Sequence, residues 1–375
     1  MPKPFASVEA VIDALRPSYP VYCLRPAALQ AQVRRFCALF PGTVLYAVKC
    51  NPHPLVLDAL YAAGIRDFDT ASLPEIAAIN ERFDEAACYF MHPVKSRPAI
   101  QAAYGVYGVR HYVVDHPTEL GKVLDEIPAR DVTLVVRLKT PPDPRTVYDL
   151  SSKFGCDVDT AVALLRAIDA AGCASGIAFH VGSQCGAPGS YAVALALVAE
   201  VMKRAGRAPS LIDVGGGFPA AYAGAAIPAL EDYMRDIRRG LDALDLPRDT
   251  TVLAEPGRAL VADACSLLVQ VQLRKERGLY LNDGIFGSLS EMALSSLRMP
   301  VRLVRPGAAM ARDTASFTLY GPTCDSLDVL PGHFELPADV REGDWLEIGQ
   351  IGAYSNALAT RFNGFHPETY VTVAR

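Results

Sequence analysis

The stretch TVLYAVKCNPHPLVLDALYAAGIRDFDT, residues 43–70, begins and ends with short strand-like runs and carries a helix-like segment between them. The runs TVLYAVK (43–49) and IRDFDT (65–70) have the length and residue types of buried strands. The segment PLVLDALYAAG repeats apolar residues at i, i+3 and i+4, which is typical of an amphipathic helix. This strand–helix–strand unit predicts a parallel sheet.

The same alternation continues to about residue 256. The further strand-like runs are CYFMHP (88–93), HYVVDH (111–116), TLVVRL (133–138), GIAFHV (176–181), SLIDVG (210–215) and TVLAEP (251–256). Eight strands alternating with helices predict an α/β barrel, the (β/α)8 barrel. The Pro-rich segment 140–155 is expected to form a long loop over the barrel mouth, and this loop is a candidate lid.

The pattern changes after residue 264. The runs SLLVQVQLRKE, MPVRLVRP, SFTLYGP and DWLEIGQIG predict antiparallel strands without long helices between them. The early run VYCLRP (21–26) is expected to join that sheet. We therefore predict a barrel at 25–263 and a mainly antiparallel β-domain made of 1–24 and 264–375.

Composition excludes several classes of protein. The chain has 375 residues, of which 51% are hydrophobic and 21% charged, so it can fill a large core and is not a disordered chain. A net charge of −5 without a Lys/Arg cluster argues against nucleic acid and membrane partners. The N-terminus lacks the apolar segment of a signal peptide. Nine scattered cysteines lack metal-site spacing, so we expect reduced thiols, no metal and a cytoplasmic location.

Most of the predicted barrel strands end in a polar residue. These residues are Lys49, Asp69, His92, Arg137, His180, Asp213 and Glu255. Active sites of (β/α)8 barrels are built at the carboxyl ends of the strands, so we expect these side chains to converge on one mouth. Lys49 is a candidate Schiff-base former, and burial is expected to disfavour its ammonium form.

Three glycines, Gly215–Gly217, directly follow the strand LIDV and are candidates for binding a phosphate group. Glycine lets the backbone approach an anion closely, and late barrel strands are the usual place for such a site. Glu255 and Arg258, in the EPGR segment, can supply an acid for a ring nitrogen and a fixed cation for the phosphate. No G-x-G-x-x-G or P-loop pattern surrounds the glycines, which disfavours a dinucleotide or ATP.

Three further segments carry candidates for binding or chemistry. His180 in FHVGSQ can stack on a flat cofactor, with Ser183 nearby for phosphate. Cys324 in GPTCDSLD lies between a Pro-containing turn and two aspartates, so its thiol can deliver a proton while Asp325 holds a substrate cation. The hydroxyl of Tyr354 can also reach a phosphate.

Together these motifs resemble the ornithine decarboxylase group of fold-type III pyridoxal 5′-phosphate (PLP) enzymes, which includes ornithine, lysine and diaminopimelate decarboxylases. The matching segments follow one another along nearly the whole chain: YAVKCN (46–51), FDTAS (68–72), SSKFG (151–155), FHVGSQ (179–184), DVGGGFP (213–219), AEPGR (254–258), NDG (282–284), GPTCDSLD (321–328) and GAYS with FNGF (352–365).

The resemblance implies PLP as the cofactor and Lys49 as its Schiff-base lysine. His180 would stack on the pyridine ring and Glu255 would pair with its protonated nitrogen, so the implied catalytic set is Lys49, Cys324, His180 and Glu255. The implied cofactor-binding set is Lys49, Asp69, Arg137, His180, Ser183, Gly215, Gly216, Gly217, Glu255, Pro256, Gly257, Arg258 and Tyr354. Glu75 is expected to help Asp69 and Arg137 organise the lysine.

The resemblance also implies a head-to-tail homodimer, because Cys324 and Asp325 would come from the neighbouring subunit. The implied reaction is decarboxylation of a basic amino acid, first of all L-ornithine to putrescine and CO2 in polyamine biosynthesis, with Cys324 returning a proton to Cα. The family carries a Tyr-Asp pair whose acid holds the distal ammonium, but Leu294 and Ser295 stand there. We expect Glu291 to take over this role, with Asp325 and Phe362 as the other substrate contacts.

Several alternatives stay open. Lysine or another diamino acid can replace ornithine, including meso-diaminopimelate, although its second carboxylate needs a cation and the CDSLD segment offers acids. A racemase would carry an arginine where Glu255 stands. A catalytically inactive homologue, acting as a binding or regulatory protein, would be expected to lack Lys49 or Cys324, and both are present.

Overall fold

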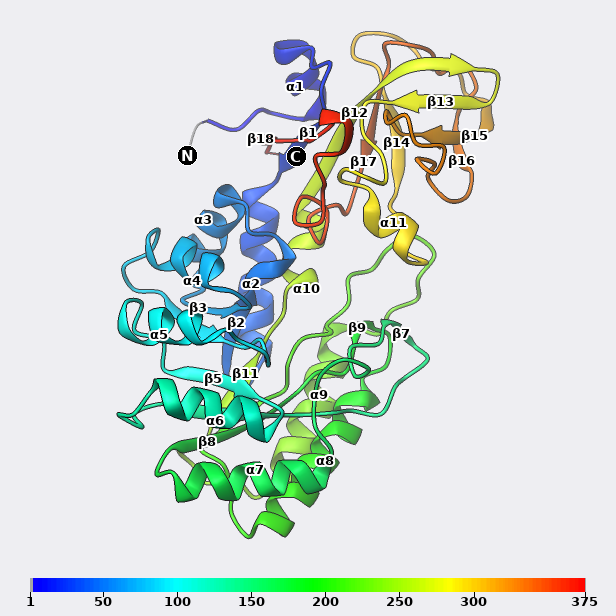
Figure 1. Ribbon diagram of the computed structural model, residues 1–375. Coiled ribbons are helices and arrows are strands. Elements are labelled where there is room, and N and C mark those ends of the chain that lie inside the picture. Colours follow the sequence, from blue (N-terminus) through cyan, green and yellow to red (C-terminus); the bar gives the residue numbers. More distant parts are fainter. Residues whose placement is uncertain (1–2, 375) are drawn as a thin grey trace.

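The computed structural model describes residues 3–374 and contains a barrel and a separate β-sheet domain (Figure 1). Eight parallel strands close into a barrel in the order β10-β11-β2-β3-β4-β5-β6-β8. The other large sheet also has eight strands and most of its pairs are antiparallel. The predicted α/β barrel with a mainly antiparallel β-domain is confirmed.

The barrel strands overlap the eight predicted runs, with β4 and β8 beginning one and two residues earlier than predicted. They are β2 (Thr43–Ala47), β3 (Asp67–Thr70), β4 (Ala87–Phe90), β5 (His111–Val114), β6 (Thr133–Leu138), β8 (Ala174–Phe179), β10 (Leu211–Asp213) and β11 (Thr251–Ala254). The helices that follow or precede them are α2 (Pro26–Leu39), α3 (Pro54–Ala62), α4 (Leu73–Asn80), α5 (Arg97–Gly105), α6 (Pro117–Glu126), α7 (Val158–Ala170), α8 (Gly189–Ala205) and α9 (Leu230–Asp242). Figure 1 shows these helices around the strands, on the side of the molecule away from the β-domain.

Local sequence explains where several of these helices begin. The side chains of Ser72, Ser96 and Asp157 accept hydrogen bonds from backbone N–H groups in the first turns of α4, α5 and α7. Such caps satisfy donors that the first turn of a helix leaves unpaired. Proline in the first turn of α4 and α5 fits for the same reason, because no N–H is required there.

Two apolar layers hold the barrel together. The inner layer takes a residue from most strands, and consists of Leu45, Tyr89, Met91, Val113, Val135, Ala178, Leu211 and Leu253. The outer layer joins the opposite faces of the strands to the helices and continues into the β-domain. The barrel interior is therefore a packed core, and polar chemistry is confined to its end.

The β-domain is built on the long strand β12 (Cys265–Lys275), which pairs antiparallel with β1 (Val21–Leu24), β13 (Gly278–Leu281) and β17 (Trp345–Ile348). The pairing of β1 confirms that the early run joins this sheet. The remaining strands are β14 (Val301–Val304), β15 (Thr314–Tyr320), β16 (Phe334–Pro337) and β18 (Thr369–Thr372). The domain bounds drawn from the sequence stay a prediction, and no strand in the described part of the chain crosses them.

The segment 140–155 is not wholly a loop. Residues Thr146–Tyr148 form β7, which pairs antiparallel with β9 (Ser183–Cys185) just beyond the barrel (Figure 1). This two-stranded sheet fixes the segment beside the barrel mouth. Within residues 3–374, no helix combines the length and the apolar character that crossing a membrane requires.

A buried ion pair joins the loop between β4 and α5 to β5 and α6. The Lys95 ammonium is inaccessible to solvent, pairs with Glu119 at 2.9 Å and donates to the carbonyl oxygen of Val113 at 2.6 Å. Burial lowers the pKa of Lys95 to about 8, although Glu119 opposes this effect. Lys95 therefore needs its carboxylate partner to stay charged at neutral pH.

We predict that Glu119→Gln lowers the free energy of unfolding by about 3 kcal/mol at neutral pH, because it leaves a buried ammonium without a counter-charge. The loss should shrink at about pH 10, where Lys95 is neutral. Urea unfolding at both pH values measures this loss in the free energy of unfolding. The control is Asp125→Asn on the same helix, which removes an exposed pair with Arg97 and should cost less than about 0.5 kcal/mol. Equal losses at both pH values for Glu119→Gln would contradict the assignment.

Candidate active site at the barrel mouth

Lys49 lies at the carboxyl end of β2, in a short 3-10 turn (Val48–Cys50). Its ammonium donates a short hydrogen bond to Asp69, the third residue of β3. Asp69 is almost completely buried, whereas 41% of the Lys49 side chain is accessible from the mouth. The ε-amine is thus held on one side and open to a ligand on the other.

The structure corrects the expected protonation state of Lys49. Burial by itself would lower the pKa of Lys49, but the carboxylates of Asp69 and Glu255 outweigh it and the pKa is raised. Lys49 is therefore an ammonium before any ligand binds. Glu75 supports the same corner, since its carboxylate accepts a hydrogen bond of 2.7 Å from the backbone N–H of Ala71.

Asp213 and Glu255 form a second buried carboxyl pair, at the ends of the neighbouring strands β10 and β11. Burial raises the pKa of Asp213 to about 6, while the adjacent Glu255 carboxyl group and a hydrogen bond from the Gly215 N–H to Asp213 Oδ1 oppose the rise. Burial and the nearby Asp213 carboxylate raise the pKa of Glu255 well above its usual range. The two carboxyl groups therefore share a proton at neutral pH, and a cationic ring nitrogen beside Glu255 would stabilise the carboxylate form of Glu255.

The three glycines after β10 wrap closely around the ends of β8 and β11. Gly215 and Gly217 have φ values of +69° and +100°, which glycine adopts without strain. A Cβ on Gly216 would lie 2.7 Å from the Glu255 carbonyl oxygen and 2.9 Å from His180 Nε2. Side chains are excluded here, so the backbone N–H groups can face a ligand.

His180 and Arg137 lie beside this turn, at the ends of β8 and β6. The Gly182 N–H donates to His180 Nδ1 at 3.1 Å, which makes that nitrogen an acceptor. Burial lowers the pKa of His180 well below its usual range, and the cations Arg137 and Lys49 add to this. A neutral imidazole avoids charge repulsion with a cofactor ring that carries a protonated nitrogen.

Arg258 begins α10 (Arg258–Val261), and its side chain is 3% exposed. It lies 4.9 Å from the centroid of the Tyr354 ring. The Tyr354 N–H donates to the Cys50 carbonyl oxygen, which ties the tyrosine to the turn that carries Lys49. Gly257 packs against Cys50 with no room for a side chain.

The remaining cofactor candidates lie in the same region. Ser183 begins β9 and pairs with Tyr148 of β7. The Pro256 carbonyl oxygen accepts a hydrogen bond from the Ala47 N–H. The mouth therefore contains the candidates from β2, β3, β6, β8, β10 and β11, and their roles toward the cofactor stay predictions.

These residues fit a phosphorylated, aromatic aldehyde cofactor. Arg258 Nε and Asp213 Oδ2 are buried side-chain atoms for which no hydrogen-bond partner is found among the described residues. The glycine turn provides an anion cradle, and Lys49 provides an accessible amine beside it. A pyridine ring that carries a phosphate, an aldehyde and a protonated nitrogen would meet the cradle, Lys49 and Glu255 respectively.

Glu291 differs from what the sequence suggested. It lies in α11 (Ser290–Leu294), is 3% exposed, and both carboxylate oxygens accept hydrogen bonds from Arg258. Ser295 donates its hydroxyl to the Glu291 carbonyl oxygen, and Leu294 is 69% exposed. Binding of a distal substrate ammonium by Glu291 stays a prediction, and it would require the carboxylate to release Arg258.

Cys324 and Asp325 lie on the β-domain, away from the barrel strands. Their loop is organised by Asp328, whose carboxylate accepts hydrogen bonds from Thr323 N, Thr323 Oγ1 and Ile285 N. Cys324 is exposed. No hydrogen bond or ion pair links Cys324 or Asp325 to a barrel residue within residues 3–374.

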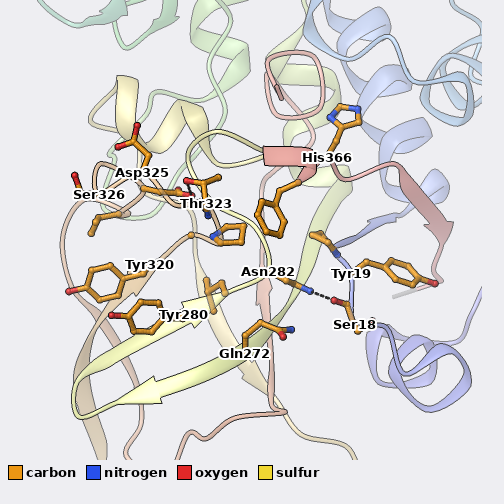
Figure 2. Close-up of a pocket in the computed structure, with 18 residues that line it drawn as sticks. Ser18, Tyr19, Gln272, Tyr280, Asn282, Tyr320, Thr323, Asp325, Ser326 and His366 are labelled. Carbon is orange, nitrogen blue, oxygen red and sulfur yellow. Dashed lines mark hydrogen bonds between the residues drawn. The ribbon is translucent and has the colours of Figure 1, made fainter. Parts of the chain in front are cut away.

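The same loop borders a cavity of about 760 Å³ on the β-domain (Figure 2). All its lining residues come from segments 18–20 and 272–366, and Asp325 and His366 lie at opposite sides of it in the figure. Stacked Tyr280 and Tyr320 form part of the wall. Phe362 packs against Phe286 nearby and is 40% exposed. One chain thus places Lys49 and Cys324 at two separate surfaces.

Sequence reasoning missed three contributors to the site. Asp213 was recognised only as a strand end, although its position directly before the glycines could have suggested a partner for Glu255. Tyr222, which accepts a hydrogen bond of 2.8 Å from Arg258, carries no motif. Asp328 was quoted within its segment, but its role in shaping the loop depends on contacts with Ile285 that only the fold provides.

A family model described as "Pyridoxal-dependent decarboxylase, pyridoxal binding domain" matches residues 27–262. The chain is 34% identical over 332 residues to the "Lysine/ornithine decarboxylase" of Selenomonas ruminantium, covering 86% of this chain and 81% of the relative.

Solved structures give the same result over nearly the full length. The lysine/ornithine decarboxylase of Vibrio vulnificus, complexed with putrescine, superposes with a TM-score of 0.84 at 31% identity, covering 97% of this chain and 96% of that chain. The arginine decarboxylase of Paramecium bursaria Chlorella virus, bound to agmatine, gives a TM-score of 0.86 at 27% identity, covering 98% and 99%.

The raised pKa values of Asp213 and Glu255 predict a pH-dependent stability for the cofactor-free chain. An acid with a raised pKa binds more proton in the folded state, so stability falls as the pH rises above the unfolded value. Glu255→Gln removes one of the two acids and should make this fall shallower between about pH 4 and pH 8. Urea unfolding of both proteins measures it. Parallel stability curves would show that the pair does not share a proton.

Proposed function

The chain belongs to the PLP-dependent decarboxylases of basic amino acids, and from this membership we propose that it converts L-ornithine to putrescine and CO2. The observation that carries the proposal is the acidic loop 321–328, which presents Cys324 together with a half-buried carboxylate, Asp325. A carboxylate suits a substrate with a second ammonium group. The similarity to lysine/ornithine and arginine decarboxylases supports this class of substrate.

We assign the binding roles at the barrel mouth to residues already in place. Lys49 is the amine that would hold PLP covalently, and Asp69 keeps it oriented. PLP, once bound, supplies an electron sink for the charge left on Cα when the carboxylate departs as CO2. Glu255 would keep the ring nitrogen in its protonated state, and His180 would stack on the ring. The glycine turn and Tyr354 would hold the phosphate.

We assign the return of a proton to Cα to the Cys324 thiol. In a single chain Cys324 lies on the β-domain, so this role requires a second copy that places its loop over the mouth. We therefore propose a homodimer with two shared sites, in which Asp325 of one subunit meets the distal ammonium of substrate bound to the other. All nine cysteines are free thiols, which supports a reducing, cytoplasmic location.

The absence of the usual acid near residue 295 affects selectivity. The nearby hydroxyl of Ser295 is already bonded to the Glu291 backbone, so it is a poor receptor for an ammonium. Asp325 is then the acid nearest to the distal amine of the substrate. The length of the substrate side chain is therefore selected by one contact instead of two. We propose that ornithine is preferred and that lysine is also accepted.

A substrate panel tests the proposal. We expect PLP-loaded protein to release CO2 and putrescine from L-ornithine, with a smaller kcat/KM for L-lysine. The panel includes D-ornithine, L-arginine, 2,4-diaminobutyrate and meso-diaminopimelate, with amine products identified by mass spectrometry. The matched control is Lys49→Ala, which should release no CO2 above background. PLP-loaded wild type that leaves ornithine and lysine unchanged would overturn the proposed substrate while leaving the family intact.

Mixing two inactive variants tests the shared site. Lys49→Ala and Cys324→Ala, allowed to exchange subunits, should recover about one quarter of the wild-type sites, because half of the dimers then contain one intact site. The control mixture is Lys49→Ala with Glu255→Ala. Both changes lie on the barrel side, so neither site of the mixed dimer is intact and no activity should return. Recovery in neither mixture, with exchange verified by mass spectrometry, would exclude the shared site.

A further inference from the structure

Arg258 is held by a carboxylate of its own chain. Its Nη1 and Nη2 donate to the two oxygens of Glu291 at 2.8 and 2.5 Å, and Nη1 also donates to the Tyr222 hydroxyl at 2.8 Å. Arg258 and Glu291 are both more than nine-tenths buried. A paired, planar contact of this kind is among the strongest that arginine makes.

A count of donors shows what remains available on Arg258. The guanidinium has five N–H groups, and three are used by Glu291 and Tyr222. Nε is buried without a partner among the described residues, and one N–H of Nη2 is also left. Nε and Nη2 lie along the same edge of the guanidinium. A second anion can therefore bind at that edge while Glu291 stays bonded to Nη1 and Nη2.

The family cofactor supplies that second anion in its phosphate group. Arg258 would then stand between two anions, one built into the chain and one carried by the ligand. Two negative charges that share one cation in a buried site repel each other.

We propose that Glu291 is the positioning residue of the phosphate site and the internal counter-ion of Arg258. It keeps the buried guanidinium charged and oriented before the cofactor arrives, and its charge then weakens the hold on the phosphate. This inference rests on the family cofactor and not on the identity of the substrate.

Glu291→Gln separates the two effects, because the amide keeps the size and an acceptor oxygen but removes the charge. We expect Glu291→Gln to bind PLP about tenfold more tightly than wild type, since Arg258 is no longer neutralised. The binding of pyridoxal, which lacks the phosphate, should change by less than about twofold. Inorganic phosphate should compete more strongly with PLP in the variant. Fluorescence titration of the cofactor-free protein measures all three.

The same variant should lower the melting temperature of the cofactor-free protein, because a buried arginine loses its partner. Asp344→Asn is the matched control, since Asp344 pairs with the largely buried Arg305 within the β-domain. It should lower the melting temperature without changing the affinity for PLP. Glu291→Asp keeps the charge and should bind PLP with an affinity close to that of wild type.

Two outcomes would overturn the proposal. One is weaker PLP binding by Glu291→Gln. The other is unchanged PLP binding, and a raised KM for ornithine beside it would instead assign Glu291 to the substrate ammonium. If the variant does not fold, a crystal structure of the PLP-loaded wild type decides: phosphate and Glu291 on the same guanidinium supports the proposal, and phosphate away from Arg258 excludes it.

Discussion

The hydrogen bond from the Glu255 N–H to the Gly215 carbonyl oxygen, 2.8 Å long, fixes the two ends of the site relative to each other. It continues the parallel pairing of β10 and β11 beyond the last regular pair of residues. Through it, the turn suited to a phosphate and the acid suited to a ring nitrogen become parts of one rigid unit. A cofactor that spans both positions is oriented by the backbone alone, before any side chain moves.

Charge within the mouth is arranged in pairs. Lys49 forms an ion pair with Asp69, and Arg258 forms one with Glu291. Asp213 shares a proton with Glu255. Lys49 and Arg258 thus each meet a carboxylate, and the proton shared by Asp213 and Glu255 leaves that pair with one negative charge. The ligand-free site is consequently close to electrical balance, and binding of a charged ligand has to redistribute protons and contacts that are already in place.

The sequence predicted the parts of this arrangement that follow local rules. Lys49, the three glycines and Glu255 follow apolar strands, and parallel closure brings strand ends together, so their convergence was predictable. The charge on Lys49 was not, because it depends on carboxylates from two other strands. The Arg258–Glu291 pair joins residues 33 positions apart, and nothing local in either segment indicates the other. Strands β13, β16 and β18 were missed because GLYL, FELP and TYVT are runs of only four residues, too short for the alternation of a strand to stand out.

The buried Asp328 carboxylate has a consequence for assembly. Its three hydrogen bonds, and the tight packing of Gly284 and Gly321 against it, give the 321–328 loop a defined backbone within a single chain. The entropy cost of ordering that loop is therefore part of the free energy of folding of the single chain. Presenting Cys324 and Asp325 to another surface therefore requires no disorder-to-order transition, so association can proceed as docking of two preformed shapes.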